Sequence, residues 1–258
     1  TAELVNVVPS EKPSDAYRAV AEKAKEFLPS YMHPWMNRSV CKRTVMTIPY
    51  NATKDSSRKY IRESLREVDI DPDKDELTQI VNAVYNSMDT IVPGPMKVMR
   101  WIKKSVGEYI RSGAKYIQWE TPSGFVVNQR RDVIETERME LQLLGRTSIR
   151  LPNGKFTLCP KRHKSSTAPN FIHSIDAAIL HRSFTQFNEP FTVIHDSVLC
   201  RAGDMATLNQ LVRETYANIF TEDCWLTKFA STINASDPPP IVGTLDPSVV
   251  SNSTYFFC

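Results

Sequence analysis

Two cations and a tyrosine stand close together in the segment NRSVCKRTVMTIPYN, residues 37–51. Arg38 and Lys42 are four residues apart, so on a helix they share one face. An Arg that clamps two oxygens beside a compact Lys charge suits a triphosphate, although such a pair is more often a solvated basic face. Pro49 ends or kinks the helix, so we expect the ring and hydroxyl of Tyr50 at its end.

The segment FTVIHDSVLC, residues 191–200, places a His-Asp step at the tip of an expected hairpin. Asp196 fits a turn, because Asp bonds to its own backbone there, and it also fits a Mg²⁺ ligand. A two-metal site would need a second carboxylate. In APNFIHS, residues 168–174, His173 shares a helix face with Asp176. A lone His on a helix is more often a core residue, and this pair does not by itself make a zinc site.

Apolar residues at three- and four-residue spacing predict the helices that position these segments. We expect helices from Ser14 to the stop at Pro29, over about 38–48, from Asp73 to the break at 92–95, from there past Ile110, over 168–184, and from Asp204. Strand-like pieces lie at Tyr116–Glu120, Phe125–Asn128, Arg138–Ile149 around Gly145, and Lys155–Leu158. The pattern predicts a helix-rich α+β architecture with a small sheet late in the chain.

The bulk composition excludes several classes of protein. The chain has 258 residues and a net charge of +3, which suits one large or two small domains and permits a polyanionic partner. It has no GxGxxG or GxxxxGK motif, so a Gly-rich nucleotide cradle is disfavoured. Five scattered cysteines without a CxxC pair indicate reduced thiols in a cytoplasmic protein. No apolar run reaches transmembrane length, so we expect no membrane partner.

Four segments, in this order, resemble the phage-type single-subunit DNA-dependent RNA polymerases, the group that includes mitochondrial and chloroplast enzymes. They are RSVCKRTVMTIPYN, WETPSGF, APNFIHSIDAAIL and FTVIHDSV, and the resemblance spans nearly the whole chain. It implies the fingers and part of the palm of a right-hand polymerase, an α+β, helix-rich fold with a small antiparallel sheet. The implied parts are a palm-to-fingers helical segment (1–30), the fingers (31–115), palm with a promoter-specificity hairpin (116–165), and palm with the His-Asp-Ser motif and a C-terminal foot at Phe257 and Cys258 (166–258).

The resemblance implies that one group of residues binds the nucleotide. Lys42 resembles the lysine that contacts the incoming triphosphate and can protonate the leaving pyrophosphate. Arg38 and Arg43 resemble its phosphate-binding neighbours. Tyr50 resembles the residue that helps to select ribose, and His173 the one that contacts the sugar side of the active-site base pair.

A second group is implied in catalysis and DNA binding. Asp196 resembles the second catalytic aspartate, a Mg²⁺ ligand, with His195 beside it. Residues 129–158 resemble the hairpin that enters the promoter major groove. Arg138 and Glu140 are two apart on its strand, so they share a face and could both reach base edges.

The chain departs from the family in one catalytic feature. The family carries its first catalytic Asp in an Asp-Gly step, and this chain has no such step. Since the implied transfer of NTPs to an RNA 3′ end uses two Mg²⁺ ions, we expect the chain alone to be inactive. We expect a second polymerase subunit to supply the first Asp and the thumb and N-terminal region. A fragment of a longer chain and a decayed remnant stay open, although retention of the five nucleotide- and metal-site residues disfavours decay.

The implied partners are the DNA template and promoter, nascent RNA, NTPs and an accessory promoter-recruitment factor, in the bacterial host cytoplasm if the source is viral. A related-family DNA polymerase fragment and a non-catalytic DNA-binding remnant are the alternatives. Ser197 after the His-Asp step disfavours the first, because that family typically has Glu there. Smaller departures are Asn51 in place of the usual Gly, Pro49 in place of a small residue, and Asp55-Ser56-Ser57 in place of aromatic residues.

Overall fold

Helices dominate the chain, and its strands pair as hairpins. The computed structural model describes residues 1–142, 147–240 and 243–257, so the expectations for Gly145 and Cys258 lie outside the described residues. The elements are α1 (Ala16–Lys25), α2 (Arg38–Thr47), α3 (Lys54–Arg66), α4 (Lys74–Ile91), α5 (Pro93–Arg111), β1 (Ile117–Glu120), β2 (Val126–Gln129), β3 (Asp132–Leu141), β4 (Thr147–Leu158), α6 (Pro160–Phe184), β5 (Phe191–Ile194), β6 (Ser197–Cys200), α7 (Met205–Glu222) and α8 (Trp225–Thr232). The helix-rich α+β class is confirmed, with antiparallel two-stranded sheets β1–β2, β3–β4 and β5–β6.

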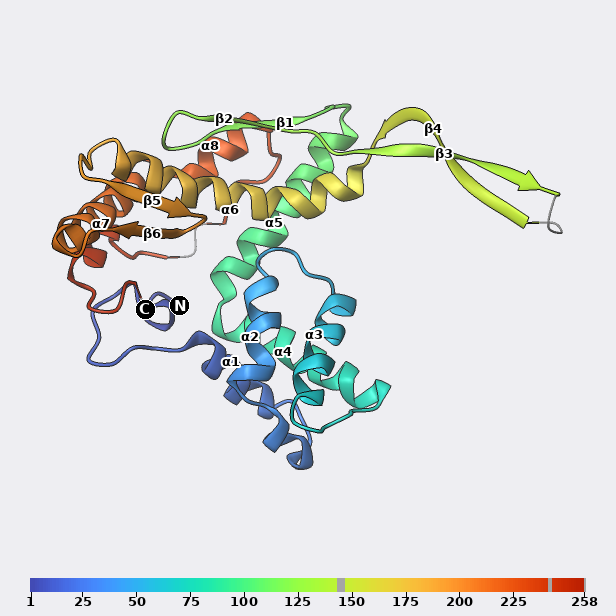
Figure 1. Cartoon of the computed structure of the whole chain (residues 1–258), viewed down its shortest axis with the longest axis horizontal. Helices are drawn as coiled ribbons and strands as arrows, with labels where there is room; N and C mark the ends of the chain where they lie inside the picture. Colours follow the sequence, from blue (N-terminus) through green and yellow to red (C-terminus); the bar gives the residue numbers. More distant parts are fainter. Residues whose placement is uncertain (143–146, 241–242, 258) are drawn as a thin grey trace.

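Helices α1 to α4 form a helical lobe with its own core (Figure 1). Each begins at a polar residue whose side chain accepts a backbone N–H, and at α4 Asp73 and Glu76 form a capping box. The sequence pattern missed α3, because Ile61 and Leu65 make a narrow apolar stripe in a highly charged segment. Both are fully buried, so tertiary packing stabilises this helix more than its composition suggests.

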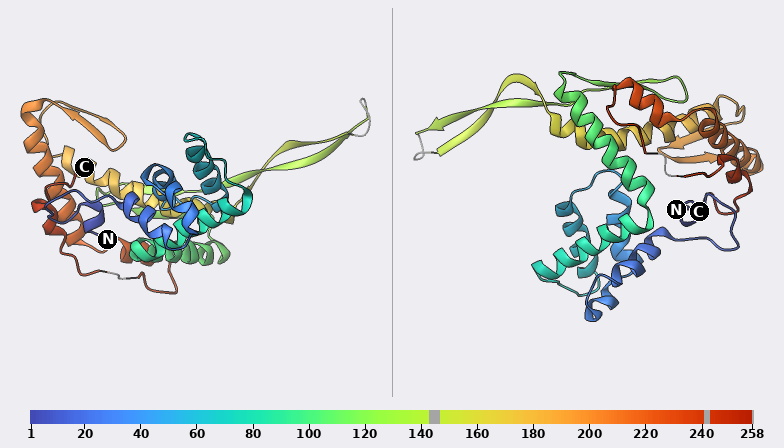
Figure 2. Two further views of the ribbon diagram at one scale, coloured as in Figure 1. Left: turned by 90° about the horizontal axis from the view of Figure 1, so that it is seen from below. Right: turned by 180° about the vertical axis from the view of Figure 1, so that it is seen from behind.

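Helix α5 connects this lobe to the rest of the molecule (Figures 1 and 2). It begins at Pro93, with only Val92 between it and the end of α4, and at this position the missing proline N–H costs nothing. Its far half packs in a second core, built around Trp101, Trp119, Phe171 and Phe229 from α5, β1, α6 and α8. The predicted break at 92–95 is therefore a helix boundary, and the next helix starts inside it.

Helix α6 is longer than the sequence predicts, because it begins at Pro160 and not near residue 168. It crosses α5 at Gly107, where a Cβ would lie 2.8 Å from the Lys164 Cδ atom. Its second half packs with α7 and β6 in a third core that includes Ile179 and Ile219. One helix thus contributes to two of the three cores.

The β3–β4 hairpin projects away from the body of the molecule (Figures 1 and 2). Its base is fixed by His163, which is fully buried and whose Nε2 accepts the Arg131 backbone N–H at 3.0 Å. The neutral ring therefore carries its proton on Nδ1, which has no hydrogen-bond partner within the described residues. Burial lowers the pKa of His163, with Arg131 and Arg130 in the same direction and Asp132 opposing.

Segments near the two ends of the described chain are in contact, through Ser253 with Asn6 and Tyr255 with Glu11. Arg213 of α7, which is buried, donates to the carbonyl oxygens of Val250 and Ser253. The Ser253 hydroxyl donates to the Asn6 carbonyl at 2.6 Å, so the segment before α1 is tied to α7. Within the described residues, no helix is both long and apolar enough to cross a membrane.

Replacing Phe229 with Ala should reduce the free energy of unfolding by about 3–5 kcal/mol, because the ring contacts three other aromatic rings and leaves a cavity. Urea unfolding monitored by circular dichroism measures the change. Phe156→Ala is the control, since that ring is 64% exposed on the hairpin and its loss should change stability by no more than about 0.5 kcal/mol. Equal losses in the two variants would contradict this description of the core.

His163→Gln should make the protein less sensitive to acid. Burial disfavours the charged imidazole, so His163 binds its proton more tightly in the unfolded chain than in the folded one. The stability that neutral His163 contributes is therefore present above about pH 6.5, the ordinary pKa of histidine. It is lost as the pH falls through the lower pKa of the folded state. Gln keeps an acceptor for the Arg131 N–H but does not titrate. The melting temperature of the variant minus that of the native chain should therefore increase as the pH is lowered from 7.5 to 5. A difference that stays constant over this range would contradict the assignment.

Candidate active site

The end of α2 is built to present Tyr50. The Asn51 N–H donates to the Ile48 carbonyl at 2.8 Å and the Ala52 N–H to the Thr47 carbonyl at 3.1 Å. These two bonds, with Asn51 in the left-handed region (φ 65°), form a Schellman motif that closes the helix. α2 ends at Thr47, one residue before the predicted end at about residue 48, and Tyr50 stands just beyond the helix end, 40% exposed.

Tyr50 lies against α6. Its ring stacks on His173 with centroids 4.6 Å apart and planes 5° apart. The next residue also contacts α6, because the Asn51 amide donates to the Ser165 carbonyl at 3.0 Å. The structure therefore brings together Tyr50 and His173, which are 123 residues apart in sequence and were predicted to face one nucleotide.

Two carboxylates act on this pair of rings. Burial raises the pKa of Tyr50, and the negative charges of Asp176 and Asp196 raise it further. Burial also raises the pKa of Asp176; the neighbouring His173 opposes this rise and Asp196 adds to it. Asp176 thus belongs to the site, although the sequence indicated only that it shares a face with His173.

Asp196 lies at the tip of the β5–β6 hairpin, as predicted. Ile194 pairs with Ser197, so His195 and Asp196 form a two-residue turn. His195 has a positive φ of 58°, as the first central residue of a two-residue hairpin turn requires. Both side chains are exposed, and within the described residues Asp196 makes no hydrogen bond or ion pair. Its carboxylate is therefore available to a ligand.

The three cations of α2 differ in their partners. Arg38 Nε donates to Asp15 at 2.6 Å, and its guanidinium lies 5.5 Å from the centre of the Tyr17 ring. Burial works to raise the pKa of Asp15, but hydrogen bonds from the Arg18 N–H and from Arg38 outweigh it, and the net pKa is lowered. No local pattern predicts this ion pair, because Asp15 caps the start of α1, 23 residues before Arg38.

Arg43 and Lys42, the other two cations, have different surroundings. Arg43 leans on α3, where it pairs with Glu63 at 2.8 Å and covers the Tyr60 ring at 4.1 Å. Lys42 is exposed and, within the described residues, has no hydrogen bond or ion pair. Of the three predicted phosphate-binding residues, Lys42 is thus the one whose charge is not already engaged.

A group of three or more His, Cys, Asp or Glu arranged to hold a metal is absent from the described ranges. Mg²⁺ does not require such a cage, because it commonly binds through one or two carboxylates, water and substrate phosphates. The exposed, unpaired carboxylate of Asp196, with Asp176 close enough to act on the same tyrosine, fits that donor set. These two carboxylates would supply part of a Mg²⁺ site and not all of its ligands.

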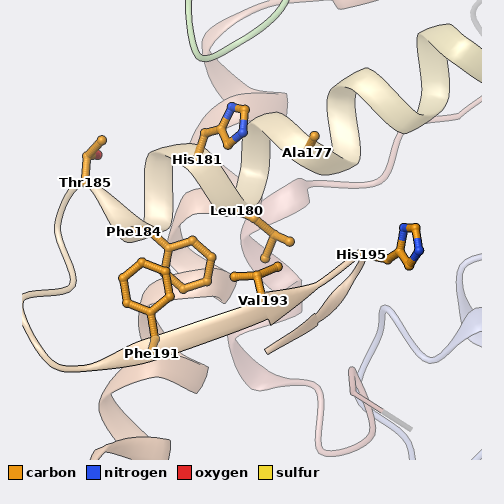
Figure 3. A pocket seen from close by; sticks show the side chains of 8 residues that line it. All are labelled: Ala177, Leu180, His181, Phe184, Thr185, Phe191, Val193 and His195. Carbon is orange, nitrogen blue, oxygen red and sulfur yellow. The ribbon is translucent and has the colours of Figure 1, made fainter. Parts of the chain in front are cut away.

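A groove runs along α6 and β5 up to His195 (Figure 3). It has a volume of about 560 Å³ and is mainly apolar, lined by Leu180 and Phe184 of α6 and by Phe191 and Val193 of β5. The Phe184 and Phe191 rings stack 4.0 Å apart at its end. β5 pairs only with β6 in the described chain, so its other edge has no strand partner there.

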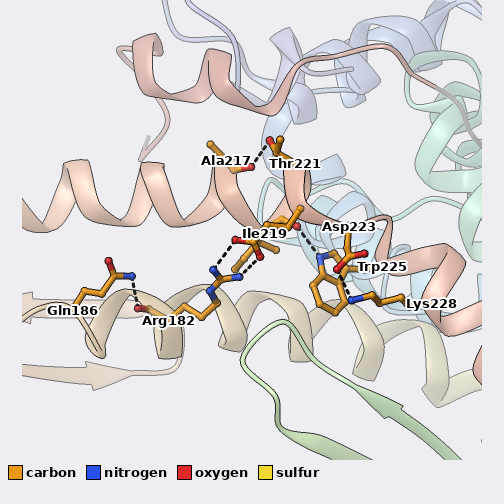
Figure 4. Close-up of polar contacts among 9 residues, drawn as sticks. Arg182, Gln186, Ala217, Ile219, Thr221, Asp223, Trp225 and Lys228 are labelled. Carbon is orange, nitrogen blue, oxygen red and sulfur yellow. Dashed lines mark hydrogen bonds and ion pairs between the residues drawn. The ribbon is translucent and has the colours of Figure 1, made fainter.

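A different side of α6 is fixed to α7 and the start of α8 (Figure 4). Arg182 forms a bidentate pair with Glu222, at 2.6 and 2.8 Å. Trp225 Nε1 donates to the Ile219 carbonyl at 2.8 Å, and Lys228 pairs with Asp223. Bidentate Arg–carboxylate pairs have a defined geometry, so the helix that carries His173 and Asp176 has a fixed position.

Arg138 and Glu140 lie on the projecting β3–β4 hairpin and not in this site. Alternation along β3 puts them on one face, and Arg138 stands opposite Arg150 of β4. Both side chains are exposed. The predicted hairpin over 129–158 is confirmed as strands 132–141 and 147–158, joined through residues outside the described ranges.

Comparison with known proteins identifies the family. Residues 1–237 match the model of the DNA-dependent RNA polymerase family. The human mitochondrial DNA-directed RNA polymerase is 26% identical over 295 residues, covering 98% of this chain and 23% of that protein. The DNA-directed RNA polymerase of Pseudomonas phage phiKMV is 26% identical, covering 86% of this chain and 28% of that protein. T7 RNA polymerase of Escherichia phage T7 is also 26% identical, covering 85% and 32% respectively.

The chain spans about a quarter to a third of the length of these relatives. The match nevertheless includes the end of α2, α6 and the β5–β6 turn, which supply the residues gathered around Tyr50. The chain therefore belongs to the DNA-dependent RNA polymerase family.

Proposed function

We propose that this chain supplies the nucleotide site and one catalytic carboxylate of a DNA-directed RNA polymerase. The observation that carries the proposal is the convergence of Tyr50, His173, Asp176 and Asp196, from three separate elements, beside the cationic helix α2. In this assignment residues 31–115 are the fingers, 116–165 are palm with the promoter hairpin, and 166–258 are palm with the His-Asp-Ser turn.

The side chains divide the work of one nucleotide addition. The RNA 3′-hydroxyl attacks the α-phosphate of an NTP; a bond from O3′ to phosphorus forms, and the bond to pyrophosphate breaks. Lys42 neutralises the triphosphate and gives a proton to the leaving pyrophosphate. Arg38 exchanges Asp15 for a phosphate oxygen, and Arg43 adds positive charge from the next face of α2. The Tyr50 hydroxyl and the His173 ring contact the sugar of the NTP.

Asp196, with His195 beside it, would hold Mg²⁺ together with the phosphates of the substrate. Two bound Mg²⁺ ions would supply activation of the attacking hydroxyl and neutralisation of the leaving group. The other carboxylate of such a pair, the first catalytic Asp, would come from an Asp-Gly segment absent from this sequence, which we assign to a second polymerase subunit. The open apolar groove beside Asp196 is a suitable surface for that segment, since an unpaired strand edge accepts another strand.

The projecting hairpin is proposed to contact DNA. Arg138 and Glu140 share a face of an exposed two-stranded ribbon, the kind of element that enters a major groove. Template, nascent RNA and NTPs complete the list of partners, and an accessory factor for promoter recruitment remains part of the proposal.

The partner can be sought by affinity purification of the chain from its native source. Co-purification of a polymerase chain with an Asp-Gly motif, together with primer extension by the complex but not by this chain alone, would support the assignment. A regulatory DNA-binding remnant would instead bind DNA in a salt-sensitive way and show no extension. A DNA polymerase would incorporate dNTPs in preference to rNTPs.

Asp196→Asn in the assembled enzyme should slow nucleotide addition by at least about 100-fold, because a neutral amide cannot hold the metal or offset charge in the transition state. Single-turnover primer extension measures the rate. Asp204→Asn is the control, since that carboxylate follows the same hairpin in sequence but already pairs with Arg201 at 2.7 Å. Elongation by Asp196→Asn at the native rate would refute the catalytic assignment.

Tyr50→Phe should retain nucleotide addition but reduce the preference for rNTPs over dNTPs by roughly tenfold, the ratio expected for one hydrogen bond. The stacked ring on His173 is kept and only the hydroxyl is lost. Competition between rNTP and dNTP in primer extension measures the preference. Tyr60→Phe, a change on α3 beneath Arg43, should leave it unaltered. An unchanged preference in Tyr50→Phe would remove Tyr50 from sugar selection.

A further inference from the structure

Asn51 connects the end of α2 to α6 through its side chain. Its Nδ2 donates to the Ser165 carbonyl at 3.0 Å, although the two residues are 114 positions apart in the sequence. We propose that Asn51 is a positioning residue that holds Tyr50 in its stack on His173 and thereby sets the sugar preference of the site. The inference rests on the proposed function only for its sugar readout; the contact itself is a property of this chain.

The Ser165 carbonyl is available because of Pro169. In a regular helix this carbonyl would accept the N–H of the residue four positions later. That residue is Pro169, which lies inside α6 and has no N–H. A helix carbonyl without its partner needs another donor, from water, a side chain or a ligand. Asn51 supplies one from a different helix, so the proline creates the acceptor that the asparagine uses.

The backbone conformation of Asn51 does not by itself call for asparagine. Glycine adopts the left-handed region without strain and is the common residue at this position of a Schellman motif. Asn234 occupies the same position after α8, with φ 47° and the same two backbone bonds, made by the Asn234 and Ala235 N–H groups. Within the described residues the Asn234 side chain makes no hydrogen bond. The two asparagines share a backbone conformation and differ in whether the side-chain amide donates a hydrogen bond.

Consecutive residues therefore hold the end of α2 at two points on α6. Asn51 contacts Ser165, and the Tyr50 ring contacts His173 about two turns further along the helix. On the other side the Tyr85 hydroxyl donates to the Ala52 carbonyl at 2.9 Å, which fixes the same turn to α4. A single contact would allow the tyrosine to pivot, whereas two contacts on one rigid helix fix its direction.

The contact lies at the edge of a small groove between α5, α6 and the α2 end, lined by Ile48, Asn51, Met99, Lys103 and Lys164. Apolar packing between the α2 end and α6 is thus incomplete here. The Asn51 hydrogen bond and the Tyr50–His173 stack connect the α2 end to α6 here. Loss of the Asn51 amide donor should therefore change the position of Tyr50.

The first test uses the chain alone in a double-mutant cycle. Asn51→Gly keeps the left-handed backbone and removes the donor; Pro169→Ala restores the N–H that takes the Ser165 carbonyl back into α6. Asn51→Gly should lower the urea midpoint in the native background and have a clearly smaller effect in the Pro169→Ala background. The extra flexibility of glycine is common to both backgrounds and cancels. Equal effects in both backgrounds would overturn the proposed contact.

The second test uses the assembled polymerase and competition between rNTP and dNTP. Asn51→Gly and Asn51→Asp should each reduce the rNTP preference by about 3- to 10-fold, the range of one net hydrogen bond. Asn51→Asp keeps the shape and the tolerance for positive φ but lacks the donor. Asn234→Gly is the matched control and should leave the preference unchanged. A purely structural role would slow both substrates equally, and that result, or an unchanged preference, would overturn the positioning role.

The two tests separate this inference from the proposed function. If the assembly with the native chain adds no nucleotide, the polymerase assignment fails and the sugar role fails with it, while the cycle on the chain alone still reports the Asn51–Ser165 contact. If nucleotide addition is normal and only the preference is unaffected by Asn51, the polymerase assignment stands and the positioning role is refuted.

Discussion

The close crossing of α5 and α6 at Gly107 is the contact on which the rest of the structure depends. Because Gly107 has no side chain, the Lys164 stem lies where a Cβ would be, and the two long helices share a core. Helix α6 then carries four separate features along its length: His163 under the projecting hairpin, Ser165 and His173 against the α2 end, Asp176 in the carboxylate pair, and Arg182 at α7. A shift of this one crossing would move all of them together.

The three cations of α2 differ in whether they already have an acidic partner. Arg38 and Arg43 each have an acidic partner on a neighbouring helix, at 2.6 and 2.8 Å, while Lys42 between them is unpaired in the described chain. Exposed ion pairs of this kind contribute about 0–1 kcal/mol, so exchanging a carboxylate for a phosphate costs little. The carboxylates of Asp176 and Asp196 act on Tyr50 from α6 and from the β5–β6 turn, and both raise its pKa beyond the effect of burial.

Much of this arrangement was predictable from local patterns. The spacing of apolar residues and the stop at Pro49 predict α2 and place Tyr50 at its end. The His-Asp step between two apolar runs predicts the β5–β6 turn. Helix α3 was missed because its stripe is narrow. Helix α6 was predicted too short because Pro169 fits the first turn of a helix, whereas it lies inside one that begins at Pro160.

The contacts between distant segments could not be predicted from those patterns. Asp15 pairs with Arg38 across 23 residues, and Asn51 with Ser165 across 114; nothing in either local sequence marks its partner. The resemblance to a family supplied the grouping of Tyr50, His173 and Asp196, but not the position of Asp176 or the use of the carbonyl that Pro169 leaves free. Those follow only from how α1, α2 and α6 pack.

The projecting hairpin has a consequence for how such a protein can diverge. Among the side chains that the structure describes, none of the buried residues of the three cores comes from strands β3 and β4, and Leu158 at their end only packs against one of the cores. Substitutions along the ribbon therefore meet few stability constraints, while those in α6 meet many. The ribbon and the cores that hold Tyr50 and His173 are therefore free to change in sequence at different rates within one chain.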